Sequence, residues 1–369
     1  MTKEKISIYV HWPFCLKKCP YCDFNSFVAK DIEHNRWTEA YKKVITGYYS
    51  EVLQNRQITT IFFGGGTPSL ATPKMIETII KTFDDASKIS SNSEITLEAN
   101  PTSVEAKKFA DFKVAGINRV SMGIQSLRDD NLQFLGRNHS VDESRNAIAA
   151  VRKSFHNYSL DFIYALPHQT LSDWKIELQE AIDLASGHMS LYQLTIEGGT
   201  KFGAMAKQGL LDEIDQDVAA EMFEITNDIT GAAGLHRYEV SNHARKGYES
   251  LHNLNYWRYG DYIGIGPGAH GRYNKIMTVD KKQPEAWLND VMTKGNALEI
   301  NNPLSDDDIR LEKIMMGMRT TEGVDISLLK NKNLTELMND NLVELEGKRV
   351  RATQKGLLVL NSLIEALVR

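Results

Sequence analysis

Short apolar runs rich in β-branched and aromatic residues recur along the first half of the chain, and segments of helical periodicity lie between them. Apolar runs of this length predict buried strands, whereas apolar positions three and four residues apart predict amphipathic helices. The predicted strands are 6–12, 59–63, 94–98, 119–124, 159–164 and 190–196. The predicted helices are 35–54, 73–87, 103–114, 141–154, 172–186 and 216–233. Alternation of this kind indicates parallel strands joined by right-handed crossovers.

Strand–helix units in this number favour an α/β fold built as an open, partial (β/α)6 barrel over a closed barrel of eight units. In such barrels the functional residues gather at the carboxyl ends of the strands. Polar residues and glycines lie at or near those ends here, and they are Gly64, Gly65, Gly66, Thr67, Glu98, Gln125, Asp161, Tyr192 and Gln193. We therefore expect the functional site at this end of the barrel.

The last third of the chain has a different pattern. A glycine- and proline-rich stretch, 264–271, marks the predicted end of a core domain that covers 1–271. The next residues, 272–302, are predicted to be a connecting segment, and 303–369 are predicted to form a small helical domain.

The predicted small domain begins with a helix capped by Ser305. Four apolar residues follow at the spacing of one helical face, and they are Leu311, Ile314, Met315 and Met318. A short strand beginning at 349 leads into a last predicted helix over 353–367. This order of elements fits a winged-helix-like fold, and the methionines are expected in its core.

The composition is that of an ordinary globular protein, because 42% of the 369 residues are hydrophobic and 25% are charged. The formal net charge of -5 argues against a nucleic-acid partner, which a basic surface would attract. No apolar run reaches the roughly 20 residues of a membrane-spanning helix. The amino-terminal residues lack the apolar region of a signal peptide, so we expect a cytoplasmic protein whose thiols stay reduced.

All three cysteines of the chain, Cys15, Cys19 and Cys22, fall in one C-x3-C-x2-C motif after the first predicted strand. An odd number of closely spaced thiols in a loop indicates metal ligation rather than disulfides or core packing. Three thiolates can hold a 4Fe-4S cluster and leave one iron open to a small chelating molecule. The alternative is a structural zinc site made by the three cysteines and His11.

Several residues at the strand ends have groups suited to a polar ligand. Glycine at positions 65 and 66 removes side chains from a turn, so that backbone groups can approach a ligand closely. Glu98 can accept hydrogen bonds from both hydroxyls of a ribose, or it is an exposed glutamate at a strand end. Arg137 can clamp a carboxylate with its planar guanidinium, and the alternative is a structural ion pair with Asp161.

His252 begins a string of polar and aromatic residues, HNLNYW, in a region that otherwise predicts a loop. Histidine is a common axial ligand of haem iron, and aromatic rings can line a porphyrin face. His252 is therefore a candidate haem ligand. The alternative, which the residues slightly favour, is a packed loop beside the barrel mouth, and His270 is equally ambiguous.

Further strings, in order along the chain, resemble the radical S-adenosylmethionine superfamily and, within it, the family of oxygen-independent coproporphyrinogen III oxidases. The strings are YVHWPFC from residue 9, FGGGTPS from 63, MGIQS from 122, DFIYALPHQT from 161 and YQLTIE from 192. The resemblance extends along nearly the whole chain. It implies that the predicted core domain is a radical S-adenosylmethionine domain and that the small domain is the carboxyl-terminal domain of this family.

The resemblance also implies a role for each matching residue. The cysteines would ligate a 4Fe-4S cluster, and S-adenosylmethionine would chelate its open iron through amino and carboxylate groups. Tyr9, Gly65 and Glu98 would contact that molecule. Residues that match the contacts of a second S-adenosylmethionine in the oxidases are Gly66, Thr67, Gln125, Arg137 and Asp161, although the matches do not by themselves imply a second molecule here.

Two departures from the oxidase pattern point to a sister branch of haem chaperones, which the string from His252 also resembles. The oxidases have a fourth motif cysteine where this chain has Phe24, and a longer segment before the motif than the fourteen residues that precede Cys15 here. The chaperone resemblance implies haem as a cargo that is delivered to respiratory acceptor proteins. Some acceptors are membrane-bound, so transient membrane association belongs to this expectation, and a homodimer is compatible with it.

The alternative function is that of an enzyme. An oxygen-independent coproporphyrinogen III oxidase makes protoporphyrinogen IX by radical oxidative decarboxylation, and the cofactor supplies the difficult chemistry while the protein orients the substrate. The polar residues Gln125, Arg137 and Asp161 are compatible with this alternative, whereas Phe24 argues against it.

Overall fold

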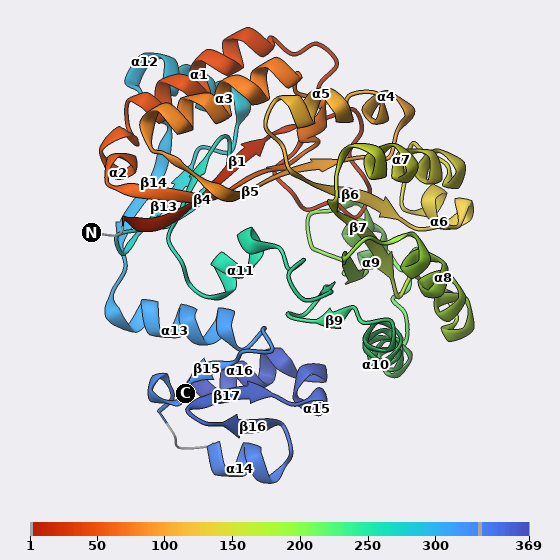
Figure 1. The fold of residues 1–369 in the computed structure, drawn as a ribbon. Helices are drawn as coiled ribbons and strands as arrows, with labels where there is room; N and C mark the ends of the chain where they lie inside the picture. Colours follow the sequence, from red (N-terminus) through yellow and green to blue (C-terminus); the bar gives the residue numbers. More distant parts are fainter. Residues whose placement is uncertain (1–2, 331–333, 369) are drawn as a thin grey trace.

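The computed structural model of the protein describes residues 3–330 and 334–368. It contains a curved, 12-stranded sheet, which arches over α11 (Leu251–Trp257) and carries helices on its outer face (Figure 1). The strands predicted from the sequence pair in parallel in chain order, so the predicted α/β class is confirmed. These strands are β1 (Glu4–Trp12), β4 (Arg56–Gly65), β5 (Ile89–Ala99), β6 (Arg119–Gln125), β7 (Asn157–Tyr164) and β8 (His188–Gln193).

The crossover helices also follow the predicted segments, with two of those segments divided. The segment 35–54 breaks at Gly47, and 103–114 breaks between Ala106 and Phe109. The resulting helices are α1 (His34–Thr46), α2 (Ser50–Gln54), α3 (Pro73–Ala86), α4 (Ser103–Ala106), α5 (Phe109–Val114), α7 (Val141–Ser154), α8 (Leu171–Leu184) and α10 (Gln216–Ala232). The short helices α6 (Asp129–Phe134) and α9 (Lys201–Lys207) and the 3-10 turn η1 (Pro68–Leu70) were not predicted.

Helix α7 illustrates why these segments are helical. Ser140 and Glu143 form a capping box that satisfies backbone N–H groups at its amino end. Ala147 and Ile148 precede Val151 by four and three residues, so all three lie on one face, and they are buried in the large apolar cluster. Local capping and an apolar stripe therefore agree on the same element.

The segment 272–302, expected to connect two domains, is instead part of the large sheet. β11 (Tyr262–Ile265) pairs in parallel with the free side of β1 and is followed by antiparallel strands. The added elements are β12 (His270–Tyr273), β13 (Ile276–Asp280), α12 (Pro284–Lys294) and β14 (Leu298–Pro303). Trp287 of α12 stacks on Trp37 of α1, with ring centroids 5.6 Å apart, which fixes this extension to the outer face.

At the opposite edge of the sheet, β10 (Asn242–Ala244) pairs antiparallel with β8, and β9 (His236–Arg237) pairs with β10. The nearby segment 251–257, expected to be a loop, is the helix α11. Its amino end is capped by Ser250, whose hydroxyl accepts a hydrogen bond from the backbone N–H of Asn253. The sequence pattern did not predict this helix because its composition is polar. Its buried face is held mainly by hydrogen bonds rather than by an apolar stripe.

The carboxyl-terminal elements form a second apolar cluster apart from the large sheet, and they lie below α11 in Figure 1. They are α13 (Asp306–Gly317), β15 (Val324–Asp325), the 3-10 turn η2 (Ile326–Leu328), α14 (Leu334–Asn339), β16 (Val343–Glu346), β17 (Arg349–Ala352), α15 (Gln354–Leu358) and α16 (Leu360–Val368). Of the apolar face predicted for the first helix, Ile314 and Met318 are in this core, whereas Leu311 is half-buried and Met315 is exposed.

The last predicted helix, 353–367, is interrupted at Val359, which ends α15 before α16 begins. Within residues 3–330 and 334–368, the structure contains no helix that is both long enough and apolar enough to cross a membrane.

Candidate functional site

The cysteine motif lies in a loop that is fastened at both ends. Cys15 ends the short strand β2 (Phe14–Cys15), which pairs in parallel with β3 (Phe27–Val28). Within the loop, Asn25 accepts a hydrogen bond at its backbone oxygen from Nε2 of His11, 2.9 Å away. The Asn25 side chain donates to the backbone oxygens of Pro267 and Lys282, at 2.8 and 2.9 Å. The loop is therefore positioned by β1 and by the distant extension of the sheet.

The thiols in this loop have an apolar, partly enclosed environment. Cys15 is buried, and Cys19 and Cys22 are half-buried. Burial raises the pKa of Cys15 and of Cys22, while hydrogen bonding to Ser26 opposes that rise for both. A bound metal reverses this preference, because a coordinating thiol is deprotonated.

The geometry does not support the zinc alternative. Both ring nitrogens of His11 are engaged, Nδ1 with the hydroxyl of Tyr9 at 2.9 Å and Nε2 with Asn25. Among the residues that the structure describes, no three His, Cys, Asp or Glu side chains are arranged to hold a single metal ion. A four-iron cluster spreads its metal atoms, so its cysteines do not have to converge on one point.

A cavity of about 370 Å³ opens beside the cysteines, and it brings together most of the predicted site residues. The lining includes all three cysteines with Gly65, Gly66, Thr67, Glu98, Gln125, Arg137 and Asp161. Tyr9 is not in this lining, although it lies close behind it, and its hydroxyl is used by His11. Asn100 and Ser121 also line the cavity and were missed from the sequence.

Glu98 and Asp161 are two half-buried carboxyl groups that line the same cavity. Burial, reinforced by the charge of Asp161, raises the pKa of Glu98 to about 8, although the backbone N–H of Gly65 donates to its Oε2 at 3.1 Å. Burial also raises the pKa of Asp161, against hydrogen bonds from Ser121 and Ser159 at 2.8 Å each. A positively charged ligand would favour the ionised form of both groups.

Arg137 also lines this cavity, next to the cysteines. Its Nη1 donates to Sγ of Cys19 at 3.6 Å, and its Nη2 donates to the backbone oxygen of Gly123 at 3.0 Å and to the side chain of Asn100. Among the described residues it forms no ion pair with Asp161, so that alternative was wrong. Its remaining N–H groups can bind a ligand carboxylate. Asn100 was missed because it lies beyond the end of β5 and is identified only by its contact with Arg137.

The backbone and side chain of Gln125 indicate a ligand contact. Its φ is 70°, in the left-handed region, at the irregularity where β6 shifts register against β7. Its side-chain oxygen is buried and has no hydrogen-bond partner among the described residues. A buried, unpaired acceptor in a cavity wall is expected to bind a donor that the protein itself does not supply.

The glycine turn after β4 leaves no room for side chains. A Cβ at Gly66 would lie 2.6 Å from the backbone oxygen of Phe14, and Gly65 has a φ of 111° that favours glycine. The turn therefore brings backbone atoms to the cavity surface, where they can contact a ligand.

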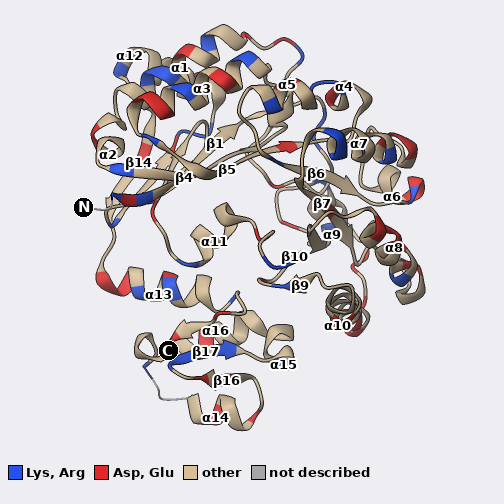
Figure 2. Cartoon of the chain, in the orientation of Figure 1, with Lys and Arg blue, Asp and Glu red and all other residues tan. Residues whose placement is uncertain are grey.

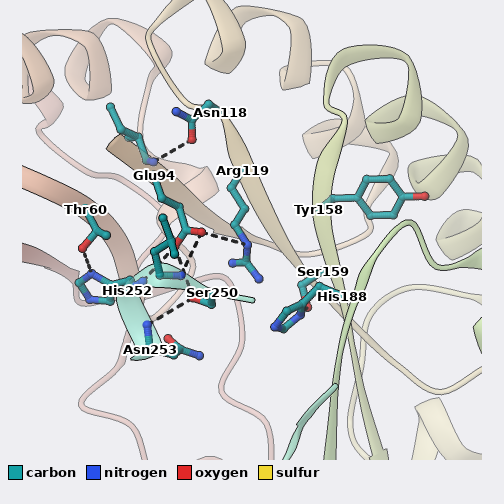
Figure 3. A network of polar contacts seen from close by, with 12 residues as sticks. Thr60, Glu94, Asn118, Arg119, Tyr158, Ser159, His188, Ser250, His252 and Asn253 are labelled. Atoms are coloured by element: carbon teal, nitrogen blue, oxygen red, sulfur yellow. Dashed lines mark hydrogen bonds and ion pairs between the residues drawn. The ribbon is translucent and has the colours of Figure 1, made fainter. Parts of the chain in front are cut away.

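His252 does not reach the cavity. It is buried, with its Nδ1 2.7 Å from the hydroxyl of Thr60 (Figure 3). Its Nε2 lies 2.8 Å from the hydroxyl of Tyr256. Its backbone N–H also donates to Glu94 at 3.1 Å. Since both ring nitrogens already have partners, this geometry favours the packing alternative over the haem-ligand prediction. His270 is exposed at the start of β12.

A polar network joins α11 to residues of the large sheet (Figure 3). Glu94 accepts from the backbone N–H groups at the start of α11 and lies 3.9 Å from Arg119. Nearby, His188 contacts the hydroxyl of Ser159 at 2.8 Å, and Ser159 donates to Asp161. Helix α11 is thus anchored by buried polar contacts. Ser159 supports the cavity wall through its hydrogen bond to Asp161.

Comparison with known proteins gives a consistent result over the whole chain. Residues 9–181 match the model of the radical SAM superfamily, and 304–359 match that of the HemN C-terminal domain. The chain is 36% identical to Radical S-adenosyl methionine domain-containing protein 1, mitochondrial, of Danio rerio, over 98% of this chain and 86% of that protein. It is 35% identical to Heme chaperone HemW of Escherichia coli strain K12, over 98% of this chain and 97% of that protein.

Among solved structures, coproporphyrinogen III oxidase (HemN) of Escherichia coli matches with a TM-score of 0.84 and 21% identity, over 99% of this chain and 90% of that chain. This likeness shows the same fold. The chain therefore belongs to the radical SAM superfamily, in the family that includes HemW and Radical S-adenosyl methionine domain-containing protein 1. Membership implies a 4Fe-4S cluster and S-adenosylmethionine as cofactors, and the unpaired oxygen of Gln125 and the side-chain-free turn at Gly66 fit a bound ligand.

Proposed function

We propose that this protein is a haem chaperone, which binds haem and passes it to acceptor apoproteins. The observation that carries the proposal is the 35% identity to Heme chaperone HemW, because it extends over 98% of this chain and 97% of that protein. Phe24 supports it, since an exposed phenylalanine lines the cavity where the resembling oxidases have a fourth cysteine.

In this proposal Cys15, Cys19 and Cys22 hold the cluster, which when bound supplies electron transfer and an open coordination position. The residues of the cavity bind and orient S-adenosylmethionine. The turn at Gly65 and Gly66 offers backbone groups to its amino end, and Arg137 offers N–H donors to its carboxylate. Thr67 stands at the end of that turn, where its hydroxyl accepts a hydrogen bond from Asn100 at 3.2 Å.

Further contacts come from the other wall of the cavity. Glu98 would accept hydrogen bonds from ribose hydroxyls, Gln125 would offer its unpaired oxygen, and the carboxyl group of Asp161 would favour a positively charged ligand. Tyr9 lies outside the lining and contributes indirectly. Its hydroxyl is hydrogen-bonded to His11, and His11 in turn is hydrogen-bonded to Asn25 of the cysteine loop. Together these residues favour a ligand that carries both positive and negative groups.

The second candidate is a coproporphyrinogen III oxidase, and the polar set of Gln125, Arg137 and Asp161 in one cavity is the observation in its favour. Two assays on cluster-loaded protein under anaerobic conditions separate the candidates. The first supplies coproporphyrinogen III, S-adenosylmethionine and a reductant, and quantifies porphyrin products together with 5′-deoxyadenosine. The second titrates haem and then adds an apoprotein acceptor.

The chaperone proposal expects saturable haem binding, transfer to the acceptor and no protoporphyrinogen product. Stoichiometric protoporphyrinogen formation would establish the oxidase instead. Failure of a fully cluster-loaded sample to bind haem would refute the chaperone function regardless of the turnover result.

A further inference from the structure

A second cavity adjoins the cluster cavity at the carboxyl ends of the last parallel strands. It has a volume of about 640 Å³, within the roughly 300–1,000 Å³ typical of small-molecule sites. One side is formed by the ends of β7 and β8 with α10, and the other by the junction of α15 and α16. We call it the rim groove and define it by Tyr192, Phe223, Val240, Arg319, Leu358 and Val359.

We propose that the rim groove is the haem-binding site of this protein, which holds the tetrapyrrole by its faces and by one propionate rather than through a strong iron ligand. The inference rests on the proposed chaperone function and adds to it the location and chemistry of cargo binding.

The groove has a mixed lining of polar and apolar side chains, and some of the apolar ones are open to solvent. Tyr192, Leu358 and Val359 are 42%, 41% and 45% exposed, although they border one cavity. Single exposed apolar residues are ordinary, but several around one concave surface mark a binding site. The break between α15 and α16 at Val359 is what turns Leu358 and Val359 towards the groove instead of the small-domain core.

Of the described residues that line the groove, Arg319 is the only charged one. Its Nη1 donates to the backbone oxygen of Met315 at 2.6 Å and its Nη2 to the side chain of Asn361 at 3.0 Å. Among residues 3–330 and 334–368 no carboxylate forms an ion pair with it, and burial lowers the pKa of Arg319. A guanidinium that is oriented, half-buried and unpaired is suited to a carboxylate such as a haem propionate.

The described lining contains no histidine, cysteine or methionine, which are the common axial ligands of haem iron. Tyrosine can also ligate haem as a phenolate. Although Tyr192 as a whole is partly exposed, desolvation of its hydroxyl, reinforced by the charge of Asp161, raises its pKa far above the usual value, so the hydroxyl stays protonated. Binding by faces and a propionate leaves the iron free for an acceptor's ligand, which suits a cargo that must be released.

The rim groove is continuous with the cluster cavity. Tyr192, Gln193 and Thr195 line both of them, so a tetrapyrrole in the groove would lie against the wall of the cofactor site. The buried His252 is in neither lining. This arrangement places the cargo beside the cofactors without occupying their cavity.

The test is a titration of cluster-loaded protein with haem, followed by the Soret absorbance. Arg319→Gln removes a charged hydrogen bond and is expected to weaken binding about tenfold, while Arg319→Lys should restore part of the loss. Leu358→Asp adds a negative charge beside the propionate and should weaken binding at least as much. Matched controls are Arg145→Gln on α7 and Leu345→Asp on β16, where Leu345 is 42% exposed and outside the groove.

The outcomes separate this inference from the proposed function. Absence of haem binding by the unaltered protein would refute the chaperone function itself. Haem binding that is equal in the unaltered protein and both groove variants would overturn the groove assignment alone, and so would a loss confined to His252→Ala. As a second measurement, iron-free protoporphyrin IX should displace haem at comparable concentration; failure to compete would show that an iron ligand holds the cargo.

Discussion

Arg137 donates a hydrogen bond to the sulfur of Cys19 across 3.6 Å, although the two residues lie 118 positions apart in the chain. The loop before α7 is thereby in direct contact with the cysteine loop. One guanidinium can thus contact both a cluster ligand and the carboxylate of a bound S-adenosylmethionine. This contact couples the two cofactor sites and gives the first prediction.

Arg137→Gln should weaken S-adenosylmethionine binding about tenfold or more, because a hydrogen bond to a charged group contributes roughly 1.5–3 kcal/mol. Iron and sulfide content should stay near that of the unaltered protein, since Arg137 is not a cluster ligand. Anaerobic equilibrium dialysis measures the binding, and Arg145→Gln is the matched control. An unchanged dissociation constant would remove Arg137 from the cofactor site.

Cys19→Ala should abolish the cluster, because the chain has only two other thiols and none can replace it. The measurements are visible absorbance and the iron and sulfide content after reconstitution. Leu16→Ala, an exposed change in the same loop, should retain the cluster. Full iron and sulfide stoichiometry in Cys19→Ala would contradict the ligand assignment.

Glu98 should make the cofactor-free protein less stable as the pH rises from 5 to 8. Its pKa is raised from 4.5 to about 8 in the folded state. The folded chain therefore holds a proton that the unfolded chain releases, and this contribution is complete below 4.5 and lost as the pH passes through about 8. Urea unfolding at several pH values measures it.

Glu98→Gln, which cannot ionise, should flatten that pH dependence, and the exposed Glu51→Gln should leave it unchanged. The same slope in all three proteins would mean that another group is responsible.

His252→Ala should lower the free energy of unfolding by about 2–4 kcal/mol, because it leaves a cavity and frees the buried hydroxyls of Thr60 and Tyr256. Thermal and urea unfolding measure the loss. The haem spectrum of the variant should be that of the unaltered protein. Loss of haem binding without loss of stability would instead identify His252 as the iron ligand predicted from the sequence.

The central sheet could be predicted because parallel strands covered on both faces leave continuous apolar runs. The strands β12 to β14 left no such run, since they lie towards an open edge and β14 is mostly exposed. Helix α11 was missed for another reason. Of its buried residues only Leu254 is apolar, and Glu94, which anchors the helix, lies more than 150 positions earlier in the chain.

The cavity was largely predictable because the carboxyl ends of parallel strands meet at one edge. Gly65, Glu98, Gln125 and Asp161 were found in this way. Asn100 and the rim groove could not be found, because both depend on contacts between segments that the sequence places far apart. The packing role of His252 could not be established from the sequence either, because only the fold brings its hydrogen-bond partners in β4 and α11 into contact with its ring.

The two hydrogen bonds from the Asn25 side chain to Pro267 and Lys282 also bear on the order of assembly. During synthesis, the cysteine loop is made more than 240 residues before these partners. Similarly, β1 cannot pair along its second edge until β11 has been made. The loop can thus take its final shape only after Lys282 has been made, so iron–sulfur loading is expected to follow closure of the sheet.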